Sequence, residues 1–162
     1  MTSAEQQPVK ILFVDDEKEI LLSLSHLLRK ENFEVLTADS GEKGLEIIRN
    51  TEGIGVIITD HIMPSMNGVA FLSKAWELAP DSLRIMLTGH SGLDVEQDAL
   101  CKGGAFRFIS KPWKNDELIQ TLRDAATIYS LIRENRRLTS LVHHMTSEKA
   151  EQRRENTFSA AA

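Results

Sequence analysis

The chain has 162 residues, 41% hydrophobic and 27% charged, as expected for an ordinary globular protein with one well-buried domain and a short appendage. Its formal net charge of -5 argues against direct nucleic-acid binding, because phosphate recognition needs concentrated Lys and Arg. A single cysteine excludes an internal disulfide, and no stretch approaches the roughly 20 apolar residues that a membrane helix requires. We therefore expect a cytoplasmic protein that does not contact a membrane.

Short apolar runs alternate with longer helical patterns along the chain. Five runs predict strands, at 9–14, 33–38, 54–59, 83–88 and 105–110. Apolar residues at three- and four-residue steps follow these runs and predict helices, at about 20–28, 40–50, 68–79, 93–103 and from 115 onward. This order predicts an α/β fold, a doubly wound five-stranded parallel sheet with helices on both faces and an extended C-terminal helix.

Polar side chains stand where the predicted strands end, and ligands of open α/β sheets bind outside those carboxyl ends. In chain order the candidates are Asp15, Asp16, Asp60, Thr88 and Lys111. The second strand contributes no candidate. If the strand order is 2-1-3-4-5, the first and third strands are neighbours, and their carboxylates converge on one site.

The residue types at these ends predict a particular chemistry. Three clustered carboxylates repel one another unless a cation compensates, and all-oxygen ligation suits Mg²⁺. The hydroxyl of Thr88 and the ammonium of Lys111 are groups that bind a phosphoryl group. An aspartate beside Mg²⁺ can attack phosphorus and carry the phosphoryl group as an acyl phosphate. We therefore predict that Asp60 is phosphorylated.

Four segments, "FVDDE", "IITDHIMPSMNG", "IMLTG" and "FRFISKPW", resemble the receiver domain of bacterial two-component response regulators. The likeness covers residues 8–126 and implies a flavodoxin-like fold with strand order 2-1-3-4-5. It implies that Asp60 is the phosphoacceptor, that Asp16 binds Mg²⁺ directly and that Asp15 binds it through water. The backbone carbonyl of Ile62 would be a further ligand.

The resemblance also implies how the signal is passed on. Thr88 would bind a phosphoryl oxygen and vacate space for Phe108 to rotate inward, while Lys111, whose bond to the following proline is often cis in this family, pairs with the phosphoryl group. The donor would be a histidine kinase or a phosphotransfer protein, and the output surface the fourth helix, fifth strand and fifth helix. Such a protein is a switch with self-catalysed phosphorylation and dephosphorylation, not an enzyme acting on outside substrates.

Two residues beside the site bear on the lifetime of the phosphoryl group. Ile62 is apolar and cannot orient a hydrolytic water, so we expect slow-to-moderate dephosphorylation. His90, two residues past Thr88, is a second position that influences the access of water.

Past residue 126 a heptad pattern begins, with a and d positions at Ile128, Leu131, Asn135, Leu138, Val142 and Met145. An asparagine at an a position favours two parallel strands in one register. We therefore expect a coiled-coil extension at 127–148 that forms a homodimer, although under three heptads also fit a frayed amphipathic helix. Composition predicts a flexible N-terminus at 1–7 and a disordered tail at 149–162.

Alternative functions fit parts of the same sequence. A phosphatase of the haloacid-dehalogenase type also forms an aspartyl phosphate, but it needs Asp-x-Asp after the first strand, where this chain has adjacent aspartates. The acidic triplet after that strand would repel the phosphate of a flavin. A coiled-coil scaffold explains only the tail. The chain is also loosely similar to receivers placed ahead of cyclic-dinucleotide phosphodiesterase or histidine-kinase modules, so it can be part of a longer protein.

Overall fold

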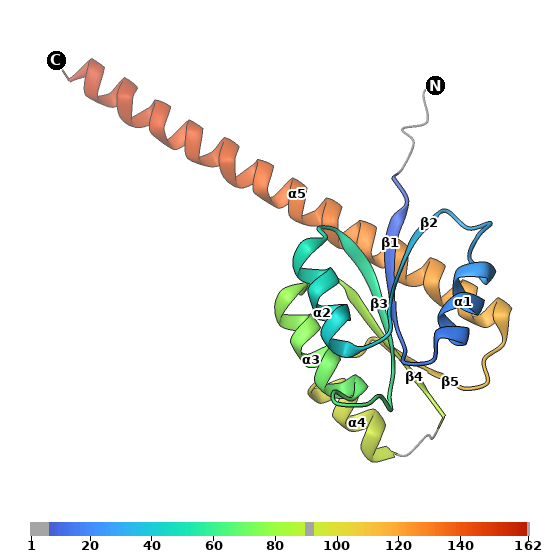
Figure 1. The fold of residues 1–162 in the computed structure, drawn as a ribbon. Helices are drawn as coiled ribbons and strands as arrows, with labels where there is room; N and C mark the ends of the chain where they lie inside the picture. Colours follow the sequence, from blue (N-terminus) through green and yellow to red (C-terminus); the bar gives the residue numbers. More distant parts are fainter. Residues whose placement is uncertain (1–6, 90–92, 162) are drawn as a thin grey trace. The chain divides into compact units, whose positions relative to one another are not determined.

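Strands and helices alternate along the chain in a computed structural model that describes residues 7–89 and 93–161 (Figure 1). The strands are β1 (Val9–Val14), β2 (Phe33–Ala38), β3 (Ile54–Asp60), β4 (Leu83–Thr88) and β5 (Arg107–Ser110). The helices are α1 (Lys18–Leu27), α2 (Gly41–Asn50), α3 (Gly68–Leu78), α4 (Leu93–Cys101) and α5 (Asn115–Ala160).

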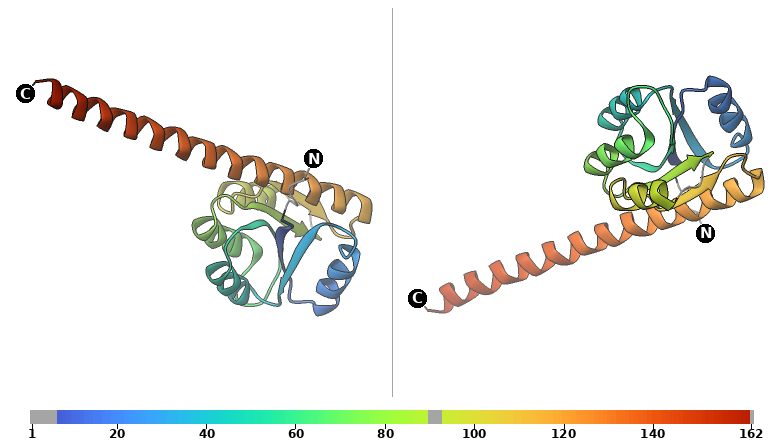
Figure 2. Two further views of the ribbon diagram at one scale, coloured as in Figure 1. Left: turned by 90° about the horizontal axis from the view of Figure 1, so that it is seen from above. Right: turned by 90° about the horizontal axis from the view of Figure 1, so that it is seen from below.

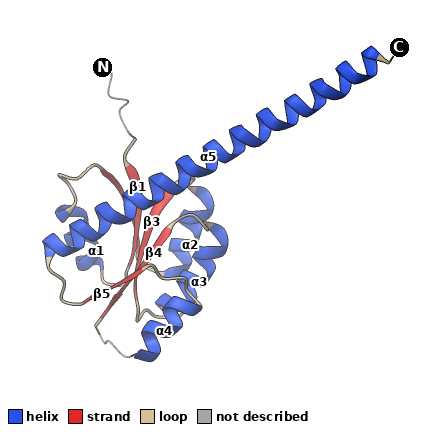
Figure 3. Cartoon of the chain, turned by 180° about the vertical axis from the view of Figure 1, so that it is seen from behind, coloured by secondary structure: helices blue, strands red, loops and turns tan. Residues whose placement is uncertain are grey.

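The five strands form one parallel sheet in the order β2-β1-β3-β4-β5, which confirms the predicted fold class. Figure 3 labels four of these strands, β1, β3, β4 and β5. Because β1 pairs with both β2 and β3, it separates β2 from the rest of the sheet. The register brings Val14 opposite Thr59, and Thr88 opposite Ser110, so the carboxyl ends of neighbouring strands meet at the same edge.

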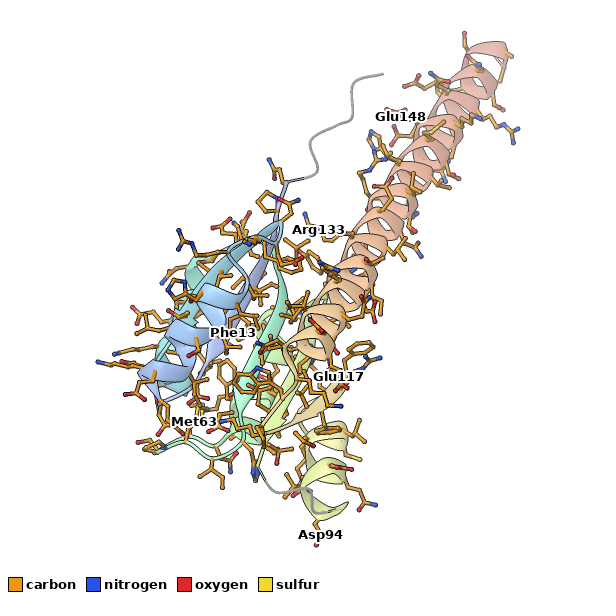
Figure 4. All side chains as sticks on the ribbon, turned by 90° about the vertical axis from the view of Figure 1, so that its right-hand side faces the viewer. Phe13, Met63, Asp94, Glu117, Arg133 and Glu148 are labelled. Carbon is orange, nitrogen blue, oxygen red and sulfur yellow. The ribbon has the colours of Figure 1, made fainter. Side chains whose placement is uncertain are left out.

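Helices cover both faces of the sheet: α2, α3 and α4 lie on one side, and α1 with the beginning of α5 on the other (Figure 2). On the first side, Leu12, Ile57 and Phe71 are fully buried in one cluster of apolar side chains. Phe13 of β1, labelled in Figure 4, is also buried. Strands covered on both faces are largely apolar, which explains the apolar runs at 11–14 of β1 and 56–58 of β3.

Local hydrogen bonds set the ends of several elements. The Ser40 hydroxyl accepts from the Lys43 N–H at 3.2 Å and caps α2. The predicted start of the fifth strand at residue 105 is wrong by two residues. The Ala105 N–H donates to the Ala99 carbonyl at 3.0 Å, so this residue closes the turn after α4, and β5 begins at Arg107.

The chain divides into two units, residues 1–129 and 130–162. In the first, Leu118, Leu122 and Ala125 of α5 are fully buried. In the second, α5 continues as helix through Ala160, where composition predicts disorder. Residues 149–160 contain no Gly or Pro and are rich in Glu, Gln, Arg and Ala, whose helix propensity outweighs the mixed charge.

Two further predictions concern the N-terminal segment and membrane contact. The predicted flexible segment 1–7 lies, apart from Gln7, outside the described residues. Among the helices that the structure does describe, none is both long and apolar enough to cross a membrane.

Candidate functional site

The charged residues of the predicted site come from three strand ends at the carboxyl edge of the sheet. Asp15 and Asp16 directly follow β1, Asp60 is the last residue of β3, and Lys111 follows β5. One carboxylate oxygen from each aspartate lies within 4.8 Å of those of the other two. The structure therefore brings the carboxylate of Asp60 together with those of Asp15 and Asp16, which lie far from it in the sequence.

Main-chain hydrogen bonds fix the positions of these residues. The Asp15 N–H donates to the Ala38 carbonyl at 3.1 Å, and the Lys111 N–H donates to the Thr88 carbonyl at 2.8 Å. The His61 N–H, directly after Asp60, donates to a carbonyl of β4 at 3.0 Å. Because each strand end is tied to its neighbour, the site stands on a rigid rim.

The two buried carboxylates are held by N–H donors and by one ammonium group. Oδ1 of Asp15 accepts from the Glu17 N–H, and Oδ1 of Asp60 accepts from the His61 N–H, both at 2.9 Å. Nζ of Lys111 lies 2.9 Å from Oδ1 of Asp60 and 3.3 Å from Oδ2 of Asp15. Asp15 and Asp60 are 2% and 8% exposed, and the cation therefore pairs with both where water is scarce.

Burial and charge shift the pKa values at this site. Burial raises the pKa of Asp15 and the charge of Asp60 adds to this, while the Glu17 N–H and the Lys111 ammonium act in the opposite direction. Burial acts to lower the pKa of Lys111, but its hydrogen bond to Asp60 and the charges of Asp15 and Asp60 outweigh this, and the pKa is raised. Lys111 is therefore protonated, and its ammonium group pairs with the carboxylates of the cluster.

The cluster suits a hard divalent cation. Three carboxylates face one ammonium, so the ionised site carries excess negative charge that Lys111 alone does not balance. All three ligands are oxygens, and Asp16 is exposed, which leaves room for coordinating waters. This donor set fits Mg²⁺. Ile62, whose carbonyl is the fourth predicted ligand, lies in the loop after β3 with its side chain 68% exposed.

Thr88 and Phe108, the predicted switch pair, lie on adjacent strands. Thr88 ends β4 and is buried, while Asp60 of the neighbouring strand pairs one residue earlier, with Leu87. Phe108 pairs with Met86, is half-buried and packs against the main apolar cluster. Thr88 and Met86 are two residues apart and so share a face of β4. The peptide bond between Lys111 and Pro112 is cis, as the resemblance implies. His90 lies outside the described residues.

Sequence reasoning missed one residue that shapes the site, Gly68. A Cβ atom at this position would lie 2.3 Å from the carbonyl oxygen of Asp60, closer than a side chain tolerates. The Gly68 N–H donates to the His61 carbonyl at 2.8 Å and closes the loop after β3 against the strand end. The dipeptide Asn-Gly at 67–68 carries a signal, but by itself this signal indicates only a turn.

Comparisons with known proteins agree with this geometry. The family model described as "Response regulator receiver domain" matches residues 11–123. A receiver domain protein from Clostridium thermocellum has a crystal structure that is 37% identical in sequence with a TM-score of 0.71, covering 76% of this chain and 98% of that one. The solution structure of the beryllofluoride-activated NtrC4 receiver domain dimer is 34% identical with a TM-score of 0.68, covering 74% and 98%.

Curated relatives are much longer proteins. The hydrogenase transcriptional regulatory protein HoxA of Bradyrhizobium diazoefficiens is 35% identical over 124 residues, which cover 76% of this chain and 25% of that protein. The chain thus spans about a quarter of the length of this relative.

Proposed function

The chain belongs to the response regulator receiver domain family, and on that premise we propose that it is a phosphorylation switch with Asp60 as the acceptor. The observation that carries the proposal is the cluster of three carboxylates within 4.8 Å, with the Lys111 ammonium 2.9 Å from Asp60. The family match gives no support to a haloacid-dehalogenase phosphatase, and the acidic edge has no role in a coiled-coil scaffold.

The reaction transfers a phosphoryl group from a phosphohistidine of a histidine kinase or phosphotransfer protein. A carboxylate oxygen of Asp60 attacks phosphorus, the N–P bond of the donor breaks, and the leaving imidazole takes a proton from water. Lys111 pairs with the phosphoryl oxygens, and the Thr88 hydroxyl donates to one of them. Held by Asp15, Asp16, Asp60 and the Ile62 carbonyl, Mg²⁺ would offset the negative charge that gathers on the oxygens.

The phosphoryl group adds about -1.5 to -2 charges and new acceptor oxygens at a rim where each strand end is already tied. Thr88 moves toward it, and Phe108, half-buried beside Met86, turns into the vacated space. Because Phe108 lies on β5, the change reaches the surface of α4, β5 and α5. The chemistry is confined to the chain's own aspartate, so the protein has no turnover of outside substrates.

We further propose that the helix beyond residue 127 pairs two copies of the chain. The NtrC4 receiver, similar to this chain, is described as a dimer in its activated form. Signals would pass from the receiver to a partner or to an output domain of a longer protein, such as a cyclic-dinucleotide phosphodiesterase or histidine-kinase module.

Incubation with acetyl phosphate and Mg²⁺, followed by intact mass measurement, tests the acceptor. We expect one added phosphoryl group in the wild type and none in Asp60→Asn. Asp39→Asn is the matched control, because Asp39 also follows a strand but pairs with Lys43 at 2.6 Å, outside the acidic cluster. A phosphoryl group that persists in Asp60→Asn, or sustained hydrolysis of added phosphomonoesters, would contradict the proposal.

A further inference from the structure

The helix after Tyr129 carries a row of exposed apolar side chains. Leu131 is 64% exposed, Leu138 49%, Val142 64% and Met145 55%. Steps of three and four residues place these side chains along one stripe of the helix. An apolar stripe of this kind associates with another apolar surface, since isolated exposure would leave each side chain in water.

We propose that two copies of the chain cover this stripe as a parallel, in-register two-stranded coiled coil, aligned by Asn135. The inference rests on the homodimer part of the proposed function and not on phosphoryl acceptance. Two features of residues 130–160 favour pairing with a second copy in this orientation. One is an amide inside the apolar stripe, and the other is a set of charges at its C-terminal end.

Asn135 discriminates between orientations. It occupies the a position between Leu131 and Leu138. In a parallel, aligned pair the two Asn135 amides face each other and hydrogen-bond across the interface. An antiparallel pair that buries the same stripe sets Asn135 against Leu138, and a shift of one heptad sets it against Val142. Both leave a buried amide without a partner across the interface, which disfavours them.

Charged side chains just past Met145, where the stripe ends, fit the same alignment. Glu148 takes a g position, and Arg153 takes the e position that follows it. In a parallel dimer the Glu148 carboxylate of one copy therefore meets Arg153 of the second copy, and the pair occurs twice by symmetry. Glu148, labelled in Figure 4, is exposed and lies 3.2 Å from Nε2 of His144 in its own helix, so its carboxylate stands at the surface where a partner can reach it.

Disulfide cross-linking in a Cys101→Ser background tests the orientation in the full chain. Val142 faces itself in the parallel, aligned pair, so Val142→Cys should form covalent dimers under mild oxidation. In the antiparallel pair Val142 lies opposite Leu131, so only a mixture of Leu131→Cys and Val142→Cys chains should cross-link. Ser140→Cys, at the outward f position, is the control and should remain monomeric.

Sedimentation equilibrium over a micromolar concentration series tests the stripe itself. Leu138→Glu should weaken self-association at least about tenfold and abolish the Val142→Cys cross-link. Ser140→Glu adds the same charge on the outer face and should change neither. Asn135→Val should tighten association about tenfold and allow both cross-linking patterns, because the aligning amide is gone.

Three results would overturn the inference: a wild-type chain that stays monomeric with and without acetyl phosphate, cross-linking only in the mixed pair, or equal effects of Leu138→Glu and Ser140→Glu. Asp60→Asn separates this inference from the acceptor proposal. That variant should still cross-link through Val142→Cys even though it takes up no phosphoryl group.

Discussion

The carboxyl edge of the sheet and the helix beyond Tyr129 depart from the usual distribution of side chains in opposite directions. At the edge, Asp15, Asp60 and Thr88 are polar and buried. Along the helix, Leu138 and Val142 are apolar and exposed. Buried polar groups and exposed apolar groups are the informative exceptions in a folded chain, because the opposite arrangement costs less free energy.

The two departures have different physical origins. The edge depends on long-range topology, since the Lys111 ammonium reaches Asp15 and Asp60 only after the strands have paired. The helix depends on local periodicity alone, and its stripe would exist in any α-helical conformation of this segment. The proposed phosphoryl chemistry is therefore tied to the fold of the receiver, whereas the proposed association depends on a stretch of sequence that needs only to be helical.

The sharpest test of this contrast compares two leucines on the same helix. Leu122 is fully buried in the receiver, and Leu122→Ala should lower the free energy of unfolding by about 2–5 kcal/mol through lost burial and a cavity. Leu138 is 49% exposed, and Leu138→Ala should change it by less than about 0.5 kcal/mol. Urea unfolding at concentrations where the wild type is monomeric measures both. Equal losses would mean that the two units are not energetically distinct.

At the acidic edge, Lys111→Met should separate phosphorylation from metal binding. Removing an ammonium that touches two carboxylates should slow phosphorylation by acetyl phosphate about a hundredfold, because a charge aimed at the phosphoryl oxygens is lost. Mg²⁺ affinity should rise, since the carboxylates lose their compensating charge. Mass measurements over time and a Mg²⁺ titration give the two readouts.

Lys114→Met is the matched control, because Lys114 is exposed and pairs with Glu117 at 3.3 Å, away from the cluster. It should leave both quantities unchanged. A variant at Lys111 that binds Mg²⁺ more weakly would show that the lysine organises the carboxylates instead of competing with the metal for them.

Much of the fold could be predicted from the sequence because strands and helices leave short, local signals, and the candidate site follows from these signals once a strand order is assumed. The apolar runs at 11–14 of β1 and 56–58 of β3 indicate strands buried on two faces, and parallel connectivity then brings their carboxyl ends to one edge. With the strand order 2-1-3-4-5, this connectivity places Asp15 beside Asp60, although one follows the first strand and the other ends the third.

Other features depend on contacts that a local pattern does not contain. Gly68 is needed because its backbone packs against the carbonyl of Asp60, a contact that exists only in three dimensions. The start of β5 depends on the hydrogen bond from Ala105 to Ala99, which ends α4. Helix through Ala160 shows a third kind of miss, in which helix propensity outweighs a composition that otherwise predicts disorder.

A substitution at Asp16 tests whether an exposed carboxylate at the edge contributes to Mg²⁺ binding as the buried ones do. Asp16→Asn should weaken Mg²⁺ binding about tenfold, because it removes one of the charges that hold the cation. Glu17→Gln makes the same change of charge on the next residue, which is exposed and outside the cluster, and should have less than about a twofold effect. Isothermal titration with Mg²⁺ measures both affinities. Equal effects would mean that Mg²⁺ is attracted by the overall negative charge and is not bound by Asp16.

The smallest expected effect concerns Ile62, an exposed apolar side chain next to the buried polar groups. Ile62 is 68% exposed, so solvent reaches it beside the site. Its side chain cannot donate or accept a hydrogen bond and therefore does not orient an attacking water. Ile62→Asn supplies an amide and should shorten the lifetime of the phosphoryl group by roughly two- to fivefold, measured by the decay of the phosphorylated mass. Ile62→Leu keeps the apolar character and should retain the wild-type lifetime. An unchanged lifetime in Ile62→Asn would mean that water reaches the phosphoryl group from another side of the site.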